Sequence, residues 1–449
     1  MSARVAALAA VSVGVESHAS DVGVGRPRSA SRPPLPPRAS PTPAGRLSIA
    51  LPDGSPTSGP DLSTTVNGVR LPNPFVIGSG PPGTNYAVMR RALEDGWGGV
   101  IVKTLSLDHS KVRNVTPRYA KTFAPDGSVI GWENMELISD RPFEAMCKEL
   151  ARLKGEFPDR VLIGSVMEEC DRARWHEVIE RTAATGVDAI EINFSCPHGM
   201  PERRMGMAMG QDPELLEEVC GWIREVCPVP FWAKMTPNVT DIADPARAAL
   251  KGGADGVCAI NTINAVTGVD LDTLAPLPTV EGMSTYGGYS YRAVKPIALA
   301  KVFRLAQMLK HDFNAGASAP AANPANPVTS SRRYTLSGIG GVDSGYDAAE
   351  FLLAGAETVQ VCTGVMIHGY GLVRTLAAEL QEFLERKGFS SLDEIVGLAT
   401  DKITTHSELL ARQDAAKAAR GNARRKGLAK DDEWTGDEFV KQADSMTSN

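Results

Sequence analysis

The stretch Val187-Asp188-Ala189-Ile190-Glu191-Ile192, followed by Asn193-Phe194-Ser195-Cys196-Pro197-His198-Gly199-Met200, decides the fold prediction for this chain. Its first half is a short apolar run, typical of a buried β-strand. Its second half places an amide, a hydroxyl, a thiol and an imidazole where the strand becomes a loop. In parallel α/β folds, functional side chains gather at the carboxyl ends of the strands. The stretch therefore predicts a parallel sheet with a reactive site at this strand end, where Cys196 is a candidate acid or nucleophile.

The same pattern of an apolar run followed by a helical segment recurs eight times after residue 62. We expect strands near 74–79, 98–103, 161–166, 187–193, 230–235, 256–261, 334–338 and 357–362. We expect helices near 85–95, 141–156, 171–184, 212–226, 242–252, 292–310, 344–354 and 370–388. Eight such units predict a (β/α)8 barrel of the TIM type, and an open, doubly wound sheet is the alternative. The candidate chemistry lies at strand ends throughout, which favours the barrel.

The segments outside this pattern predict the domain organisation. The Asn67-Gly68 turn between two short β-prone runs predicts a hairpin, which would plug the amino-terminal mouth of the barrel. Two long connections follow the second and sixth strands and would lie over the active mouth. We expect a disordered segment at 1–60, a barrel at 61–400 with a low-complexity insertion at 314–332, and a charged helical extension at 401–449; the long connections are 104–140 and 262–291.

Composition excludes several classes of protein. The net charge of −6 gives no basic field for nucleic acid, and no run of about 18 apolar residues predicts a membrane span. The seven cysteines form no Cys-x-x-Cys pair, so we expect neither a metal site nor an iron–sulfur cluster, and free thiols are the simplest interpretation. Cys196 stands apart from the others, most of which we interpret as small buried hydrophobic residues.

The first 50 residues have a composition of their own. They contain six arginines and eight serines but only two acidic residues, Glu16 and Asp21. Such a segment cannot bury a core. The pattern predicts an organelle transit peptide, and a disordered tail without an address is the alternative.

Cationic and amide side chains follow several of the expected strands. Lys103 closes the second strand and Lys234 the fifth. Lysines at equivalent strand ends could hold an anionic cofactor or stabilise a reduced, negatively charged ring, although each alone could be an ordinary surface lysine. Asn134, Asn193 and Asn261 lie at or after strand ends as well. Because an amide offers one acceptor and two donors, such a set suits a small planar ligand with alternating N–H and C=O groups.

Glycine-rich segments follow the seventh and eighth strands. The seventh leads into Gly338-Ile339-Gly340-Gly341 and the eighth into Cys362-Thr363-Gly364. In barrels these two loops often build a phosphate site from backbone N–H groups, which predicts a phosphorylated cofactor such as FMN. Gly287-Gly288, in the loop after the sixth strand, could let the backbone approach a ligand closely.

The thiol of Cys196 suits a general acid. An unperturbed thiol has a pKa of about 8.5 and is mostly protonated at neutral pH. It can therefore donate a proton without special tuning. Its position in a loop beside Ser195 and His198 favours this role over that of a buried hydrophobic residue.

Longer motifs give the chain a family resemblance. The segments Asn193–Gly206 and Gly210-Gln211-Asp212-Pro213-Glu214, together with Ala233–Asp241 and Gly252–Gly256, closely resemble the pyrimidine-reducing domain of the dihydropyrimidine dehydrogenases. From residue 62 to about 445 the chain looks most like the short, plant-type NADP⁺-linked form. The wider superfamily contains the FMN-dependent dihydroorotate dehydrogenases, which share an Asn-x-Ser-Cys-Pro core.

The resemblance implies an FMN barrel that reduces uracil and thymine to their 5,6-dihydro forms, the first step of pyrimidine breakdown. Flavin N5 would pass a hydride to C6 of the pyrimidine, and Cys196 would protonate C5 from the other face. Lys103 and His198 are the other expected catalytic residues. The expected flavin contacts are Ser79, Lys103, Thr104, Asn134, Asn193, Lys234, Asn261, Gly287, Gly288, Gly340, Gly341, Cys362 and Thr363. The expected substrate contacts are Asn134, Glu136, Asn193, Ser195, Asn261 and Thr262.

The same resemblance implies NADPH as the electron donor, a homodimer and a chloroplast location, with a mitochondrion or the cytoplasm as alternatives. No dinucleotide fingerprint of the Gly-x-Gly-x-x-Gly kind follows a strand, so NADPH would reach the same flavin directly or a partner flavoprotein would deliver electrons. A dihydroorotate dehydrogenase of pyrimidine biosynthesis is the alternative enzyme, although the His198 loop favours uracil. A non-catalytic flavin- or pyrimidine-binding protein is the third possibility, which the context of Cys196 disfavours.

Overall fold

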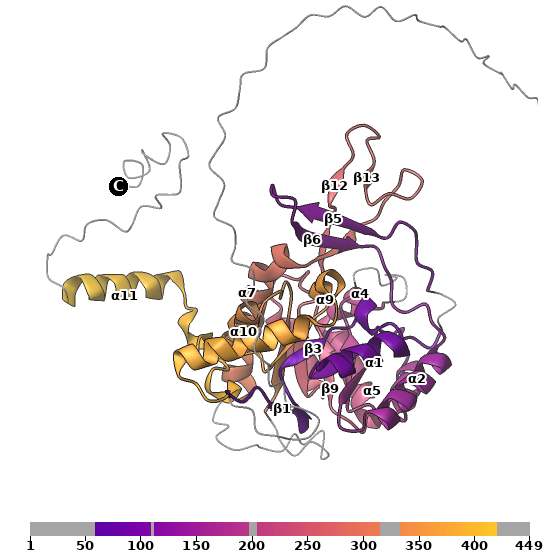
Figure 1. Cartoon of the computed structure of the whole chain (residues 1–449), viewed down its shortest axis with the longest axis horizontal. Helices are drawn as coiled ribbons and strands as arrows, with labels where there is room; N and C mark the ends of the chain where they lie inside the picture. The colour runs from indigo at the N-terminus through magenta and orange to yellow at the C-terminus, as the bar shows by residue number, and fades with distance from the viewer. Residues whose placement is uncertain (1–58, 109–111, 197–203, 315–332, 420–449) are drawn as a thin grey trace, which may run out of the picture. The chain divides into compact units, whose positions relative to one another are not determined.

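The computed structural model describes residues 59–108, 112–196, 204–314 and 333–419. Eight parallel strands close into a barrel in these ranges, as the alternating pattern predicted (Figure 1). The barrel strands are β3 (Phe75–Ile77), β4 (Gly99–Ile101), β7 (Val161–Val166), β8 (Ala189–Asn193), β9 (Phe231–Lys234), β10 (Gly256–Ala259), β15 (Thr335–Ile339) and β16 (Thr358–Val361). Strand β16 pairs with β3 and closes the ring.

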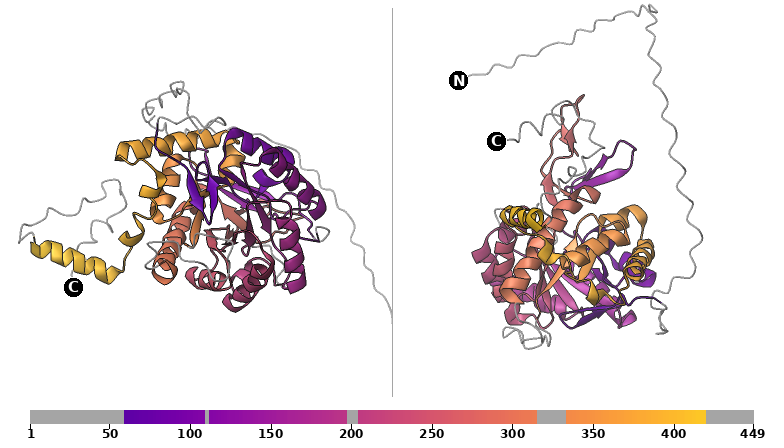
Figure 2. Two further views of the ribbon diagram at one scale, coloured as in Figure 1. Left: turned by 90° about the horizontal axis from the view of Figure 1, so that it is seen from below. Right: turned by 90° about the vertical axis from the view of Figure 1, so that its left-hand side faces the viewer.

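A layer of helices surrounds the strands (Figure 2). These helices are α1 (Tyr86–Asp95), α2 (Phe143–Glu156), α3 (Arg172–Ala183), α5 (Pro213–Val226), α6 (Ala243–Lys251), α7 (Lys295–Met308), α8 (Gly345–Ala354) and α10 (Leu372–Lys387). Each lies within three residues of its predicted bounds. The predicted fold is confirmed, and the open-sheet alternative is wrong because β16 and β3 are paired.

Local signals in the sequence explain where several helices begin. The Asp171 side chain accepts a hydrogen bond from the N–H of Arg174 at the start of α3, and Asp212 does the same for Leu215 at the start of α5. In α8, Ser344 and Asp347 form a capping box. These side chains satisfy N–H groups that have no partner within the helix.

The predicted hairpin closes the amino-terminal end of the barrel. Strands β1 (Thr64–Val66) and β2 (Val69–Leu71) pair antiparallel, and Val66 and Leu71 pack among the inward-facing side chains of the barrel. In the turn, the Asn67 amide oxygen accepts hydrogen bonds from the Trp232 indole N–H at 2.7 Å and the Thr335 hydroxyl at 2.6 Å. The plug is therefore fixed to the barrel by buried hydrogen bonds as well as by apolar packing.

The two long connections contain structure that the periodicity did not reveal. They form a four-stranded antiparallel sheet in the order β11-β14-β6-β5, which we call the lid sheet: β5 (Tyr119–Phe123), β6 (Val129–Asn134), β11 (Ile263–Ala265) and β14 (Gly287–Ser290). Strand β14 pairs with β6, so the second and sixth connections are joined. The short pair β12 (Gly268–Val269) and β13 (Pro276–Leu277) extends from the same region (Figure 1).

Seven short helices, and one longer carboxyl-terminal helix, lie outside the helical layer of the barrel in the described ranges. They are η1 (Pro81–Gly83), α4 (Met207–Gly210), η4 (Arg292–Val294), η5 (Leu309–Phe313), α9 (Thr363–His368), η6 (Leu392–Glu394), η7 (Thr400–Lys402) and α11 (His406–Ala419). Almost all of the predicted amino-terminal segment and of the low-complexity insertion, and the end of the tail, lie outside the described residues. No helix within the described ranges has the length and apolarity needed to cross a bilayer.

Candidate active site

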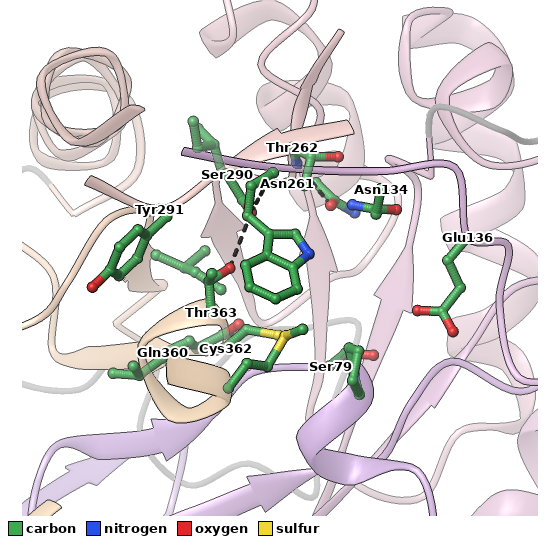
Figure 3. Close-up of a pocket in the computed structure, with 18 of the residues that line it drawn as sticks. Ser79, Asn134, Glu136, Asn261, Thr262, Ser290, Tyr291, Gln360, Cys362 and Thr363 are labelled. Carbon is green, nitrogen blue, oxygen red and sulfur yellow. Dashed lines mark hydrogen bonds between the residues drawn. The ribbon is translucent and has the colours of Figure 1, made fainter. Parts of the chain in front are cut away.

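A cavity opens at the carboxyl ends of the barrel strands, between the barrel and the lid sheet. Its volume is about 1160 Å³ when the part open to solvent is included. Its wall combines residues that follow barrel strands, such as Lys103, Cys196 and Asn261, with residues of the lid sheet, such as Asn134 and Ser290. Figure 3 shows side chains from both sources directed into the same space.

Lys103 belongs to a buried polar cluster. Its ammonium lies 2.6 Å from the Glu136 carboxylate, and both side chains are more than nine-tenths buried. The same carboxylate accepts hydrogen bonds from Arg118 at 3.1 Å and from the Tyr119 hydroxyl at 2.7 Å. Burial, and then this hydrogen bond, raise the pKa of Tyr119, so its phenol remains a neutral donor.

Lys234 is held inside the barrel mouth. Its ammonium donates to the Gln360 amide oxygen at 2.6 Å and lies 3.4 Å from the Glu191 carboxylate. The Gln360 amide nitrogen donates back to Glu191 at 2.8 Å. Because all three side chains are buried and line the cavity, they place a compensated positive charge beside it.

A chain of hydroxyls and amides lies across the ends of four strands. The Ser79 and Thr104 hydroxyls are 3.1 Å apart, and the Asn193 amide nitrogen donates to Thr104 at 2.9 Å. The Ser195 hydroxyl donates to the Asn193 amide oxygen at 3.0 Å and accepts from the Asn261 amide nitrogen at 2.7 Å. Ser195 is fully buried and is not part of the cavity wall, so it supports the two asparagines from behind.

The lid sheet brings Asn134 and Thr262 to the same region. The Asn134 amide nitrogen donates to the Gly288 carbonyl at 3.0 Å. A Cβ on Gly288 would lie 2.2 Å from the Thr262 hydroxyl and 3.2 Å from the Asn134 amide nitrogen. The absence of a side chain on Gly288 therefore lets both of these side chains approach its backbone. Gly287 and Gly288 are not part of the cavity wall, and a Cβ on Gly287 would meet the Glu133 carboxyl at 2.2 Å.

Cys196 lies on the cavity wall with 6% of its surface exposed. It packs in a small apolar cluster with Ile138, Met167 and Met205. Its carbonyl accepts a hydrogen bond from the Met207 N–H at 3.1 Å, where the chain returns from the loop. The predicted catalytic residue His198 lies outside the described residues.

The glycine-rich segments lie together at another part of the wall. Gly340 and Gly341 both have positive φ angles, 139° and 76°, which favour glycine. Thr363 begins α9, and its hydroxyl lies 3.0 Å from that of Ser290 on the lid sheet. A phosphate group could therefore meet backbone N–H groups and two hydroxyls here. Burial raises the pKa of the neighbouring Cys362 to about 12, which keeps that thiol neutral.

Several cavity residues were not predicted from the sequence. They are Tyr119, Trp132, Glu191, Tyr291 and Gln360. Two of these carried a usable signal, because Glu191 and Gln360 are polar residues inside apolar strand runs. The aromatic residues had no comparable signal, since their place depends on how the lid sheet packs over the barrel.

Comparison with known proteins gives the chain its family. The family model described as dihydroorotate dehydrogenase matches residues 61–314 and 329–384, which together are more than half of the chain. The chain belongs to the dihydroorotate dehydrogenase family. The membership of this superfamily that the sequence motifs predicted is therefore confirmed.

Curated relatives within the dihydroorotate dehydrogenase family differ in their reactions. The chain is 59% identical over 397 residues to the chloroplastic dihydropyrimidine dehydrogenase (NADP⁺) of Arabidopsis thaliana, an alignment that covers 87% of this chain and 89% of the relative. It is 42% identical to the NAD-dependent dihydropyrimidine dehydrogenase subunit PreA of Escherichia coli, with coverage of 78% and 79%. It is 34% identical to the catalytic subunit of dihydroorotate dehydrogenase B (NAD⁺) of Pyrococcus abyssi, with coverage of 75% and 99%.

A solved structure supports the fold assignment independently. The DHODH of Eimeria tenella, in complex with ferulenol, matches with a TM-score of 0.59 at 20% sequence identity, and the match covers 75% of this chain and 88% of that one. At this identity the likeness supports the barrel fold alone.

Proposed function

We propose that this chain is a dihydropyrimidine dehydrogenase that uses FMN and NADPH to reduce the 5,6 double bond of uracil and thymine. The observation that carries the proposal is the convergence of Asn134, Asn193, Asn261 and Thr262 with Cys196 on the wall of one cavity. A pyrimidine base presents alternating N–H and C=O groups, which amide and hydroxyl side chains can pair with. The high identity to the Arabidopsis enzyme over most of both chains supports the same function.

The cavity fits FMN at two places. Gly340 and Gly341 line the cavity and pack where only glycine fits, because a Cβ on Gly340 would lie 2.6 Å from Ala298 and one on Gly341 2.7 Å from the Tyr291 carbonyl oxygen. Lys234 places its ammonium on the wall, where it can donate a hydrogen bond to the flavin ring. Ser79, Thr104 and Cys362 add small side chains to the wall. When bound, FMN supplies the hydride chemistry that no side chain can perform.

The residues of the chain then orient the substrate and deliver a proton. Asn193 and Asn261 are held by Thr104 and Ser195, so their amides are fixed before the substrate arrives. Cys196 supplies the proton that the pyrimidine needs at C5, because an ordinary thiol carries a proton to donate at neutral pH. Lys103 lies beside the same space, and its ammonium charge is balanced by the Glu136 carboxylate.

The ion pair between Lys103 and Glu136 disfavours the alternative activity on orotate. Orotate carries a carboxylate, which calls for a cation free to bind it. The Lys103 ammonium is already neutralised by Glu136 at 2.6 Å.

We also propose a chloroplast location, directed by residues 1–60, and a homodimer. The location is supported by the acid-poor, arginine-rich composition and by the chloroplastic relative. Fusing residues 1–60 to a fluorescent protein tests the address, and a signal confined to mitochondria or the cytosol would contradict it. Sedimentation of the full chain measures the oligomeric state, and a monomer at micromolar concentration would contradict the dimer.

Anaerobic oxidation of NADPH by the full-length chain with added FMN tests the proposed function. We expect uracil and thymine, but not orotate, to drive the oxidation. Oxidation driven by orotate alone would overturn the proposal. If NADPH is inert but uracil is reduced after dithionite has reduced the flavin, the pyrimidine chemistry stands and a partner flavoprotein delivers the electrons.

A further inference from the structure

Tyr291 has a backbone conformation that side-chain-bearing residues rarely adopt. Its φ is 81° and its ψ is −160°, a region that is essentially restricted to glycine. Strain of this kind persists only where the surrounding structure holds the residue in place, and it clusters at binding and active sites. Tyr291 follows β14 of the lid sheet and precedes η4, so it lies at the junction between the lid and the barrel.

A buried carboxylate holds the Tyr291 side chain. The tyrosine hydroxyl donates to the Asp343 carboxylate at 2.9 Å, and the His368 imidazole lies 2.8 Å from the same oxygen. The other oxygen of Asp343 accepts from Arg292 at 2.9 Å. Tyr291 is 3% exposed and the Asp343 side chain 7% exposed. Hydrogen bonds to a buried charged group are among the stronger ones in proteins.

This network encloses the glycine-rich end of the cavity. Tyr291 lines the cavity together with Gly340, Gly341 and Thr363. Its carbonyl oxygen would lie 2.7 Å from a Cβ on Gly341, so the two backbones are in close contact. Figure 3 shows Tyr291 and Thr363 at the end of the cavity away from Glu136. The network therefore links Tyr291, Asp343 and His368, which come from three separate segments of the chain. These segments surround the backbone to which we assign the binding of the phosphate.

The network also compensates a charge that would oppose phosphate binding. Asp343 lies two residues after Gly341 in the loop that follows β15. An uncompensated carboxylate so close to a phosphate dianion would repel it. The Arg292 guanidinium and the donors from Tyr291 and His368 offset this carboxylate.

We propose that Tyr291 is a positioning residue that preorganises the phosphate-binding end of the cavity through Asp343 and His368. The inference rests on the proposed function, because the phosphorylated ligand is FMN. It predicts a specific effect on the phosphate. Loss of the tyrosine hydroxyl should weaken the binding of FMN but not that of riboflavin, which has the same ring and no phosphate.

Fluorescence titration of the full-length chain, freed of flavin, with FMN and with riboflavin tests this role. The variant Tyr291→Phe removes the hydroxyl alone. His368→Ala removes a second donor to Asp343 from a partly exposed position, so it is expected to fold even if the first variant does not. The matched control is Tyr86→Phe on α1, which also loses a hydroxyl bonded to a carboxylate, that of Glu156. Thermal unfolding of each flavin-free variant measures its stability.

We expect Tyr291→Phe to raise the Kd for FMN about tenfold, about 1.4 kcal/mol, because Asp343 then loses a donor that offsets its charge beside the phosphate. The Kd for riboflavin should stay within about twofold, and His368→Ala should show a smaller effect of the same kind. Equal weakening of both ligands, or no change in either, would overturn the positioning role. A wild-type chain that binds riboflavin as tightly as FMN would overturn the phosphate site of the proposed function and this role with it.

Discussion

The ammonium nitrogen of Lys103 lies 2.6 Å from a carboxylate oxygen of Glu136. Lys103 follows barrel strand β4, whereas Glu136 follows strand β6 of the lid sheet. The ion pair therefore fixes the lid to the barrel at the edge of the cavity. Together with Arg118, which also donates to Glu136, this pair determines which charges a substrate meets there.

Glu136→Gln should weaken this connection and change substrate preference. The lysine would keep a neutral acceptor but lose its buried counter-charge, so we expect kcat/KM for uracil to fall about tenfold or more. The freed cation should favour a carboxylated substrate, so the ratio of orotate to uracil turnover should rise. Steady-state kinetics with reduced flavin measures both quantities. Glu94→Gln, which removes an exposed partner of Arg90, is the control, and an unchanged substrate ratio in Glu136→Gln would contradict the assignment.

Cys196→Ala should separate the two half-reactions. Removal of a general acid typically slows the proton-dependent step by about 10²–10⁴-fold, so pyrimidine reduction should be lost to that extent. Binding of FMN and reduction of the flavin by its donor should survive, because neither needs the thiol. Stopped-flow absorbance follows both steps, with Cys170→Ala as the control at a cysteine away from the cavity wall. Normal turnover of uracil in Cys196→Ala would remove the thiol from the mechanism.

Lys234→Met should destabilise the barrel by about 3–5 kcal/mol, because it leaves the Glu191 carboxylate buried without a cation. The double variant Lys234→Met/Glu191→Gln should recover part of this loss, since the uncompensated charge is then gone. Urea unfolding measures the free energy of unfolding. Lys310→Met, at an exposed pair with Asp401, should change it by less than about 0.5 kcal/mol. A double variant as unstable as the single one would contradict the explanation by charge burial.

Glu357 should give the stability a specific pH dependence. Burial raises the pKa of this carboxyl to about 7 in the folded chain. The folded state therefore takes up a proton at higher pH than the unfolded state does, and stability from this group increases as pH falls from about 7 to about 4.5. Relative to Glu357→Gln, the wild type should gain up to about 3 kcal/mol across this window. Unfolding of both proteins at several pH values measures the difference, and parallel curves would contradict it.

The barrel strands could be predicted because each is a short apolar run bounded by polar or glycine residues. Burial on both faces requires such a run whatever the neighbouring strands are, so Val161–Val166 and Ala189–Asn193 were visible in isolation. The lid strands were not visible for the opposite reason. Tyr119–Phe123 and Val129–Asn134 are half-buried and pair with each other, and Val129–Asn134 is placed by its pairing with β14 of the other connection.

The sequence by itself determined the barrel, the strand-end positions of Lys103, Cys196, Lys234 and the asparagines, and the family motif. These follow from local periodicity and from the rule that parallel strands end on one face. Only the tertiary structure decided how the two lysines are paired, because their partners Glu136 and Gln360 come from other parts of the chain. It also placed Ser195 behind the wall and Tyr291 at the glycine-rich end, since those positions depend on long-range packing rather than on the residues nearby.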